Sequence, residues 1–163
     1  MFSYDIQALA RRVVEEGAAR GLTIACAESC TGGLVAAAIT AVPGSSAVLD
    51  RGFVTYSNAA KTQMLDVPAE LIEVSGAVSE AVARAMAEGA LRNAGADVSV
   101  AVTGVAGPGG GSEAKPVGLV HFAAIGPAGA VHVEHRFGDI GREAVRLESV
   151  RTALGLLLDR IGA

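Results

Sequence analysis

The segment that decides the fold is Leu22-Thr-Ile-Ala-Cys-Ala-Glu-Ser-Cys-Thr-Gly-Gly33. Its first part is apolar and rich in branched side chains, which favours a buried strand over residues 22–27. A short polar turn follows, and two glycines then lead into a run of small apolar residues that predicts a helix over 32–42. The segment therefore predicts a strand whose carboxyl end carries a polar turn against the start of a helix.

This turn places Ser29 beside a predicted helix N-terminus, where free N–H groups and a partial positive charge favour an anion. Ser29 could attack a carbonyl carbon there while nearby N–H groups bind the developing oxyanion. The alternative is an ordinary helix cap, which is the commoner role of a serine before a helix. Cys30 is a rival nucleophile, but no histidine partner accompanies it, so we expect it to pack as a small apolar residue, like Cys26 in the strand.

Length and composition predict a single domain over residues 1–163 with a substantial core. Hydrophobic residues make up 51% of the chain and the mean hydropathy is +0.44. No apolar stretch reaches the ~18 residues that a membrane helix needs, so we expect no membrane partner. The first residues lack the pattern of a signal peptide, and the two cysteines are too close for a disulfide framework. A cytoplasmic, reducing location is the expectation.

Two classes of partner are not supported by the composition. Lysine and arginine number 13 against 17 acidic residues, and only 4% of residues are aromatic, so the positive surface that nucleic acids require is not expected. His132 and His135 are an odd number of positions apart on a predicted strand and therefore point to opposite faces. No Cys/His cluster has zinc spacing, so we expect no metal.

The rest of the chain alternates between strand and helix patterns. Strands are predicted over 52–57, 98–103, 117–125 and 130–137, and helices over 4–20, 58–66, 80–94 and 142–160, with a further helical turn after Pro68. Asn58 is the expected cap of the short helix, and the last two strands form a hairpin. Five strands interspersed with helices predict an α/β fold, a three-layer α/β/α sandwich with a mixed, mostly parallel five-stranded sheet.

Three predicted strands end in polar or glycine-rich turns, at Glu28-Ser29, at Tyr56-Ser57-Asn58 and at Thr103-Gly104. Ligands of open α/β sheets bind beyond the carboxyl ends of the strands. If these three strands are parallel, their turns meet in one crevice. The sequence thus predicts a binding site at this end of the sheet.

Lys61 lies at the start of the short helix that follows the second of these turns. The helix dipole disfavours a cation there by about 0.3–1 kcal/mol, which lowers the lysine pKa by less than the one unit that about 1.36 kcal/mol represents. Burial in a crevice lowers it much further. A neutral Lys61 would activate Ser29 without a histidine. The alternative is a solvated surface lysine. Tyr56 could relay a proton or stack on a ring, and the alternative for it is a half-buried tyrosine with a satisfied hydroxyl.

The loop from Gly104 to Gly111 is rich in glycine, and its successive N–H groups could form an anion-binding nest. It matches neither the phosphate-binding loop of nucleoside triphosphatases nor the dinucleotide fingerprint. A flexible surface loop explains it equally well. Arg142 and Arg146, one turn apart at the start of the last helix, could reach a phosphate or lie on the surface.

Five motifs occur in an order that resembles the CinA C-terminal domain family, and the resemblance covers nearly the whole chain. They are Ala27-Glu-Ser-Cys-Thr-Gly-Gly33, Gly52-Phe-Val-Thr-Tyr-Ser-Asn58 with Lys61, Gly76-Ala-Val-Ser79, Thr103-Gly-Val-Ala-Gly-Pro108 and Lys115-Pro-Val-Gly118. Val105 stands where the family pattern suggests isoleucine, a harmless exchange. The family includes stand-alone nicotinamide-nucleotide amidohydrolases.

This resemblance implies hydrolysis of the carboxamide of nicotinamide mononucleotide to nicotinate mononucleotide and ammonia, a salvage reaction of pyridine nucleotides. Ser29 would be the nucleophile and Lys61 the base, directly or through Tyr56, with no cofactor. The residues expected to bind the substrate are Glu28, Cys30, Thr31, Gly32, Gly33, Thr103, Gly104, Gly107 and Arg142. Two alternatives stay open: a catalytically silent nucleotide-binding or partner-binding module, and an amidase for another small amide. A homo-oligomer, most simply a dimer, is expected from the apolar composition and short helices.

Overall fold

The structure, a computed structural model, describes residues 1–162. Its elements in chain order are α1 (Tyr4–Arg20), β1 (Ile24–Glu28), α2 (Leu34–Thr40), η1 (Ser45–Ala47), β2 (Leu49–Val54), α3 (Asn58–Leu65), α4 (Ala69–Ser75), α5 (Glu80–Ala94), β3 (Val98–Gly104), β4 (Leu119–Gly126), β5 (Gly129–Arg136) and α6 (Arg142–Gly162). No helix among these is long and apolar enough to cross a membrane.

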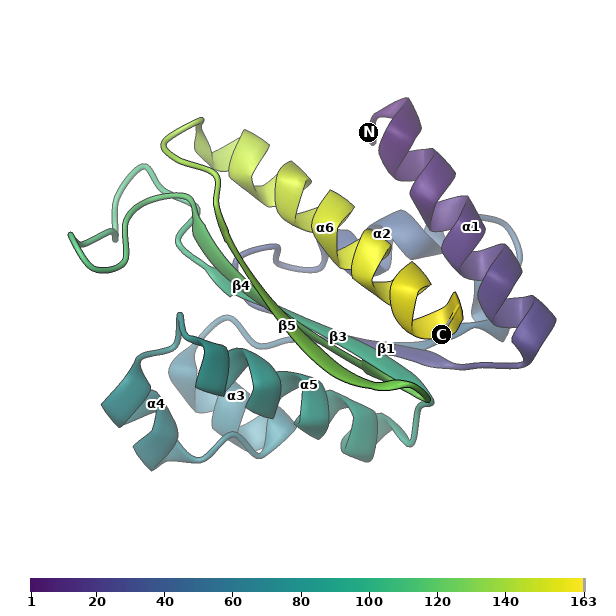
Figure 1. The fold of residues 1–163 in the computed structure, drawn as a ribbon, viewed down its shortest axis with the longest axis horizontal. Helices are drawn as coiled ribbons and strands as arrows, with labels where there is room; N and C mark the ends of the chain where they lie inside the picture. The colour runs from purple at the N-terminus through teal and green to yellow at the C-terminus, as the bar shows by residue number, and fades with distance from the viewer. Residues whose placement is uncertain (163) are drawn as a thin grey trace.

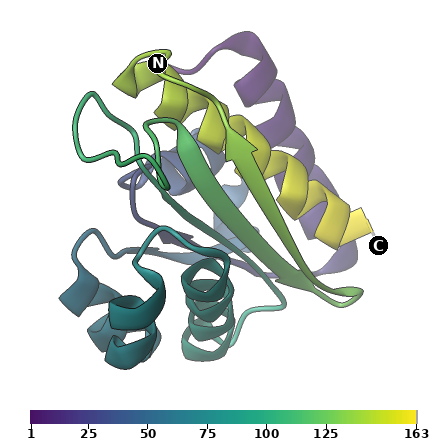
Figure 2. The ribbon, with the colours of Figure 1, turned by 60° about the vertical axis from the view of Figure 1, so that its left-hand side comes forward.

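The elements form the predicted three layers. Helices α1, α2 and α6 cover one face of the sheet and α3, α4 and α5 cover the other (Figure 1). A view turned by 60° shows the two groups of helices on opposite sides of the sheet, with the glycine-rich loop before β4, green in the picture, projecting from one end of the sheet (Figure 2). The α/β/α sandwich that the alternation of patterns predicts is confirmed.

The sheet has the strand order β2-β1-β3-β4-β5 and is mixed, as predicted. Strands β2, β1 and β3 are parallel, β4 runs against β3, and β5 runs against β4. From β1 the chain runs through α2 to β2, which pairs with one edge of β1. From β2 it runs through α3, α4 and α5 to β3, which pairs with the other edge of β1. The carboxyl ends of β1 and β3 therefore lie at a topological switch point, where α/β proteins bind ligands.

Most elements begin and end within a few residues of prediction, and the differences lie around the polar turns. Helix α2 begins later than expected because Gly32 and Gly33 adopt φ values of 56° and 102°, which belong to the turn rather than to a helix. Strand β2 begins and ends earlier than predicted. Ser57, not Asn58, caps α3, since its hydroxyl accepts the N–H of Ala60 at 3.0 Å. Residues 55–57 therefore lie between β2 and α3, where the predicted bounds left none.

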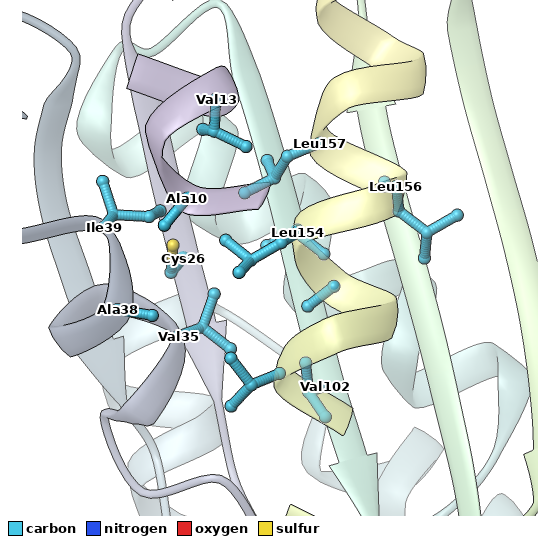
Figure 3. Close-up of a cluster of buried hydrophobic side chains, with 14 of the residues drawn as sticks. Ala10, Val13, Cys26, Val35, Ala38, Ile39, Val102, Leu154, Leu156 and Leu157 are labelled. Carbon is cyan, nitrogen blue, oxygen red and sulfur yellow. The ribbon is translucent and has the colours of Figure 1, made fainter. Parts of the chain in front are cut away.

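Two hydrophobic cores hold the layers together and fix the elements that carry the polar turns. On the upper face in Figure 1, side chains of α1, α2 and α6 pack on β1 and β3, with Cys26 buried among them (Figure 3). On the lower face, α5 is packed so closely on the end of α3 that a Cβ on Gly89 would lie 1.9 Å from the carbonyl oxygen of Leu65. Only glycine permits this approach, which fixes the helix that carries Lys61.

Candidate active site

The turns that follow β1, β2 and β3 meet around one cavity of about 280 Å³, as the sequence predicts. The loop before α5 and the first residue of α6 complete its wall. The cavity is lined by Ser29, Cys30, Tyr56, Asn58, Lys61, Ala77, Val78, Thr103, Gly104, Val105, Ala106, Gly107, Gly109, Gly110 and Arg142.

Ser29 and Lys61 are in direct contact in this cavity. Lys61 Nζ lies 3.0 Å from Ser29 Oγ, although the two residues are 32 positions apart in the chain. Ser29 is 9% exposed and Lys61 only 1% exposed, so the pair is largely withdrawn from water. The end of β1 supplies the serine and the first turn of α3 supplies the lysine, which the packing of α3 on α5 holds in place.

Lys61 Nζ has three oxygen neighbours, which can accept the three N–H groups of an ammonium and still satisfy the amine after it loses a proton. Its Nζ donates to the carbonyl oxygens of Thr55 at 2.9 Å and Tyr56 at 3.4 Å. A neutral amine has two N–H groups and one lone pair. The two carbonyls can take both N–H groups, which leaves the lone pair to accept the hydroxyl proton of Ser29.

The electrostatic surroundings of Lys61 favour loss of its proton. Burial lowers the pKa of the Lys61 ammonium below its ordinary value, and only a charge on the Cys30 thiol would oppose this. Within residues 1–162 no carboxylate lies at ion-pair distance from Lys61. A buried ammonium without an anionic partner is costly, which is the condition under which a lysine acts as a base.

Glu28, which precedes Ser29, is fully buried but does not face the cavity. Its carboxylate accepts the N–H groups of Val35 at 2.9 Å and Ala36 at 3.1 Å, in the first turn of α2. Each carboxylate oxygen of Glu28 thus accepts a backbone N–H, and the positive end of the helix stabilises its negative charge. We had expected Glu28 to contact substrate, but its carboxylate instead joins the end of β1 to the start of α2. These bonds fix the turn that carries Ser29.

The N–H groups of this turn divide into engaged and free ones. Ser29 N–H donates to the carbonyl of Val102 and Gly32 N–H to the carbonyl of Ser29, both at 3.0 Å. In the described chain the N–H groups of Cys30 and Thr31 have no backbone acceptor. The N–H of Gly33 likewise has no backbone acceptor within residues 1–162, so of the donors predicted between Cys30 and Gly33 all except that of Gly32 remain available to an oxyanion beside Ser29.

Cys30 lines the cavity but is a poor nucleophile. Its side chain is 5% exposed, and burial raises the pKa of the Cys30 thiol to about 12. The thiolate is the reactive form of cysteine, and almost none is present at neutral pH. The structure thus favours Ser29 over Cys30.

Tyr56 and Arg142 form the mouth of the cavity. The Arg142 guanidinium donates to the hydroxyl of Tyr56 at 2.9 Å and to the carbonyl of Gly107 at 2.8 Å. Tyr56 is 60% exposed, and its hydroxyl is engaged by Arg142 rather than by Ser29 or Lys61. Since Ser29 and Lys61 touch directly, proton transfer between them needs no relay through Tyr56.

The other predicted site residues fall into two groups. Thr103, Gly104 and Gly107 line the cavity, and the Thr103 hydroxyl donates to the carbonyl of Ala77 at 2.8 Å, which holds the opposite wall. Thr31, Gly32 and Gly33 belong to the turn that carries Ser29 and are not among the residues that line the cavity. Ala77 and Val78 belong to one of the five motifs but were not predicted as site residues, because small apolar side chains carry no chemical signature in a sequence.

Arg146 does not reach the cavity, unlike Arg142. Its Nε donates to the carbonyl of Cys30 at 3.1 Å and its Nη2 to the carbonyl of Thr31 at 3.2 Å. The two arginines that the sequence grouped together therefore hold different parts of the site.

The histidines are not among the residues that line the cavity. His121 Nδ1 and His132 Nε2 are hydrogen-bonded at 2.9 Å, while His135 packs against Phe122 and Phe137 on the other face, as the strand periodicity predicts. Residues 1–162 contain no group of three or more His, Cys, Asp or Glu side chains placed to hold a metal ion.

Comparison with known proteins gives a consistent picture. The family model of the CinA C-terminal domain matches residues 6–161. A crystal structure of the competence/damage inducible protein CihA from Agrobacterium tumefaciens superposes with a TM-score of 0.97 at 53% identity, covering 100% of this chain and 99% of that one. The fold and the family are thus supported over almost the whole chain.

Curated relatives differ in length. The nicotinamide-nucleotide amidohydrolase PncC of Enterobacter agglomerans is 55% identical over 148 residues, which are 86% of this chain and 90% of that protein. A CinA-like protein of Synechococcus sp. (strain RCC307) is also 55% identical, over 157 residues, but the match covers 96% of this chain and only 38% of that protein. The chain spans little more than a third of such CinA-like relatives.

Proposed function

The chain belongs to the CinA C-terminal domain family, and we propose that it hydrolyses the carboxamide of nicotinamide mononucleotide to nicotinate mononucleotide and ammonia. The observation that carries the proposal is the 3.0 Å contact between Lys61 Nζ and Ser29 Oγ inside a cavity. A hydroxyl beside a buried amine without an anionic partner is suited to acyl transfer. The similarity to PncC supports an amide of a nicotinamide nucleotide as substrate.

The first half of the reaction forms an ester on Ser29. Ser29 Oγ attacks the carboxamide carbon while its proton passes to Lys61 Nζ, and the carbonyl oxygen becomes an oxyanion. The free N–H groups of Cys30 and Thr31 would bind that oxyanion. Lys61 then gives its proton to the amide nitrogen, which leaves as ammonia when the carbon–nitrogen bond breaks.

The second half of the reaction regenerates the serine. A water molecule attacks the ester carbon and passes a proton to Lys61. The intermediate collapses, the bond to Ser29 Oγ breaks, and the proton on Lys61 returns to that oxygen. The nicotinate product is released, and the enzyme returns to its starting protonation state with no cofactor consumed.

The mouth of the cavity supports a phosphorylated substrate. Arg142 uses two of its N–H groups on Tyr56 and Gly107 and carries further donors that a phosphate can accept. Arg146 is occupied with the turn carbonyls, so of the two arginines Arg142 is the one that we assign to the phosphate.

An ammonia-release assay on nicotinamide mononucleotide, nicotinamide riboside and nicotinamide tests this function. We expect release from the mononucleotide well above that from the riboside, because the riboside lacks the group that Arg142 binds. Equal rates on all three would identify a general amidase instead. Binding of the mononucleotide without ammonia release would identify a silent binding module and overturn the proposal.

A further inference from the structure

The nucleophile turn is held from outside by a single side chain of α6. Arg146 donates from Nε to the carbonyl of Cys30 at 3.1 Å and from Nη2 to the carbonyl of Thr31 at 3.2 Å. We propose that Arg146 is a positioning residue that aims and polarises the peptide N–H groups that bind the oxyanion. This inference rests on the serine chemistry of the proposed function.

The effect follows from the peptide groups that Arg146 contacts. The carbonyl of Cys30 and the N–H of Thr31 belong to one planar peptide unit, so a donor fixed on that carbonyl also fixes the direction of the N–H. A hydrogen bond to a carbonyl also strengthens the N–H of the same unit as a donor, by about 10–30%. The Thr31 N–H has no backbone acceptor within the described residues, and it is the group whose donor strength increases.

The second carbonyl contact completes the arrangement. The carbonyl of Thr31 shares its peptide unit with the N–H of Gly32, which donates to the carbonyl of Ser29 at 3.0 Å. Arg146 therefore contacts two consecutive peptide units of the turn. The Thr31–Gly32 unit closes the turn through its N–H, and the Cys30–Thr31 unit keeps its N–H available. A cation at this place also stabilises negative charge developing on a carbonyl oxygen nearby.

The glycines of the turn are matched to this arginine. Gly32 has a φ of 56°, and a Cβ there would lie 3.3 Å from Arg146 Nη2. A side chain at Gly32 would be strained and would also crowd the guanidinium. Both glycines thus allow the turn to form, and Gly32 leaves space for the arginine that holds it.

Arg142 provides a matched control on the same helix. It lies one turn before Arg146, also donates two hydrogen bonds, and also bonds to a loop carbonyl, that of Gly107 at 2.8 Å. Arg142 lines the cavity, whereas Arg146 does not. Loss of a contact between Arg142 and the substrate should therefore raise KM. Loss of the contacts by which Arg146 positions the turn for the transition state should instead lower kcat.

Steady-state ammonia release from nicotinamide mononucleotide separates the two arginines. We expect Arg146→Lys and Arg146→Gln to lower kcat about 10–100-fold, which is less than the loss of an oxyanion donor itself, with KM changed by no more than about twofold. Arg142→Gln should raise KM about tenfold and leave kcat within about threefold. Melting temperatures and circular dichroism establish that each variant is folded.

A second measurement does not depend on the natural substrate. A small alkyl fluorophosphonate ester reacts by attack of Ser29 Oγ on phosphorus, with loss of fluoride and transfer of the serine proton to Lys61. Its phosphoryl oxygen, which gains negative charge in the transition state, occupies the oxyanion position. Mass spectrometry follows the labelling. We expect Arg146→Lys to slow it about tenfold, whereas Arg151→Lys, on the same helix but bonded to Asp5 and Glu148 outside the cavity, should change it by less than about twofold.

These measurements distinguish failure of the proposed substrate from failure of the role proposed for Arg146. Absence of ammonia from the wild-type protein, together with Arg146-dependent labelling, refutes the substrate and retains the positioning role. Labelling and kcat that stay at wild-type level in folded Arg146 variants overturn the inference. A loss that only follows the fraction of unfolded protein also overturns it, because a purely structural residue gives that result.

Discussion

The two ends of the cavity are built in different ways. At the chemical end, Ser29 and Lys61 are 9% and 1% exposed, and the lysine amine is bonded to Ser29 and to the backbone of the strand end. At the mouth, Tyr56 is 60% exposed, and its hydroxyl bonds to Arg142, another rim side chain. The first end is fixed by the fold and the second by contacts that a ligand can replace.

The difference matches what the proposed reaction requires of each end. A proton transfer between Ser29 and Lys61 requires a fixed distance and little water, because solvation would return the lysine to its charged form. Recognition of a charged group at the mouth requires donors that can change partner, and exposed bonds are cheap to exchange. Substitutions at the two ends should therefore differ in size and in kind.

Removal of the nucleophile is expected to have the largest effect. Ser29→Ala should lower kcat for ammonia release at least about 10³-fold, because no other group in the cavity replaces the hydroxyl. The fold should persist, since the backbone bonds of the turn do not involve the side chain. A folded Ser29→Ala protein with near-normal turnover would remove Ser29 from the mechanism.

Removal of the base is expected to come next. Lys61→Met should lower kcat about 10²–10⁴-fold, the usual contribution of a positioned acid–base group. Lys115, the other lysine of the chain, donates to the carbonyl of Ser75 at 2.6 Å and provides the control. Lys115→Met should keep kcat within about threefold, and equal losses in both variants would contradict the role of Lys61.

The same lysine predicts a pH-dependent stability. Burial lowers the pKa of Lys61 in the folded chain, so the unfolded chain holds more protons between that pKa and the ordinary value of about 10.4. The free energy of unfolding contributed by Lys61 should therefore rise with pH across this interval, by about 1.36 kcal/mol per pH unit. Urea unfolding of the wild type and Lys61→Met measures the difference, which should vanish if the lysine is solvated.

Loss of the Tyr56 hydroxyl should have a modest effect. Tyr56→Phe removes one hydrogen bond to Arg142 at the mouth, worth about 0.5–1.5 kcal/mol, so kcat/KM should fall by no more than about tenfold. The loss should appear in KM. A fall in kcat of about 10²-fold or more would instead assign Tyr56 the proton relay that the sequence left open.

Changes at Cys30 should have the smallest effect. With the thiol pKa at about 12, only about one molecule in 10⁵ carries the thiolate at pH 7. Cys30→Ala should retain kcat within about threefold, and iodoacetamide should leave the wild-type activity unchanged. Inactivation by iodoacetamide that Cys30→Ala abolishes would contradict the choice of nucleophile.

The sequence predicted those features that depend on local patterns. Apolar periodicity and terminal glycines located the long helices, and the polar turns after three strands located the cavity. It mistook the role of Glu28, because the N–H groups that occupy this acid belong to α2, in Val35 and Ala36. Periodicity likewise placed Arg142 and Arg146 together but contained nothing about their partners, which for Arg146 lie 116 and 115 positions away.

The protonation of Lys61 is the claim on which the chemical end depends, and ¹⁵N NMR of its Nζ measures it most directly. The chain has two lysines, and Lys115→Met leaves a single Nζ signal to follow with pH. We predict that Lys61 loses its proton below the ordinary lysine value of about 10.4, and that kcat/KM rises with pH through the same transition and then levels off. A Lys61 signal that titrates at or above that value, or an activity that ignores its titration, would contradict the account.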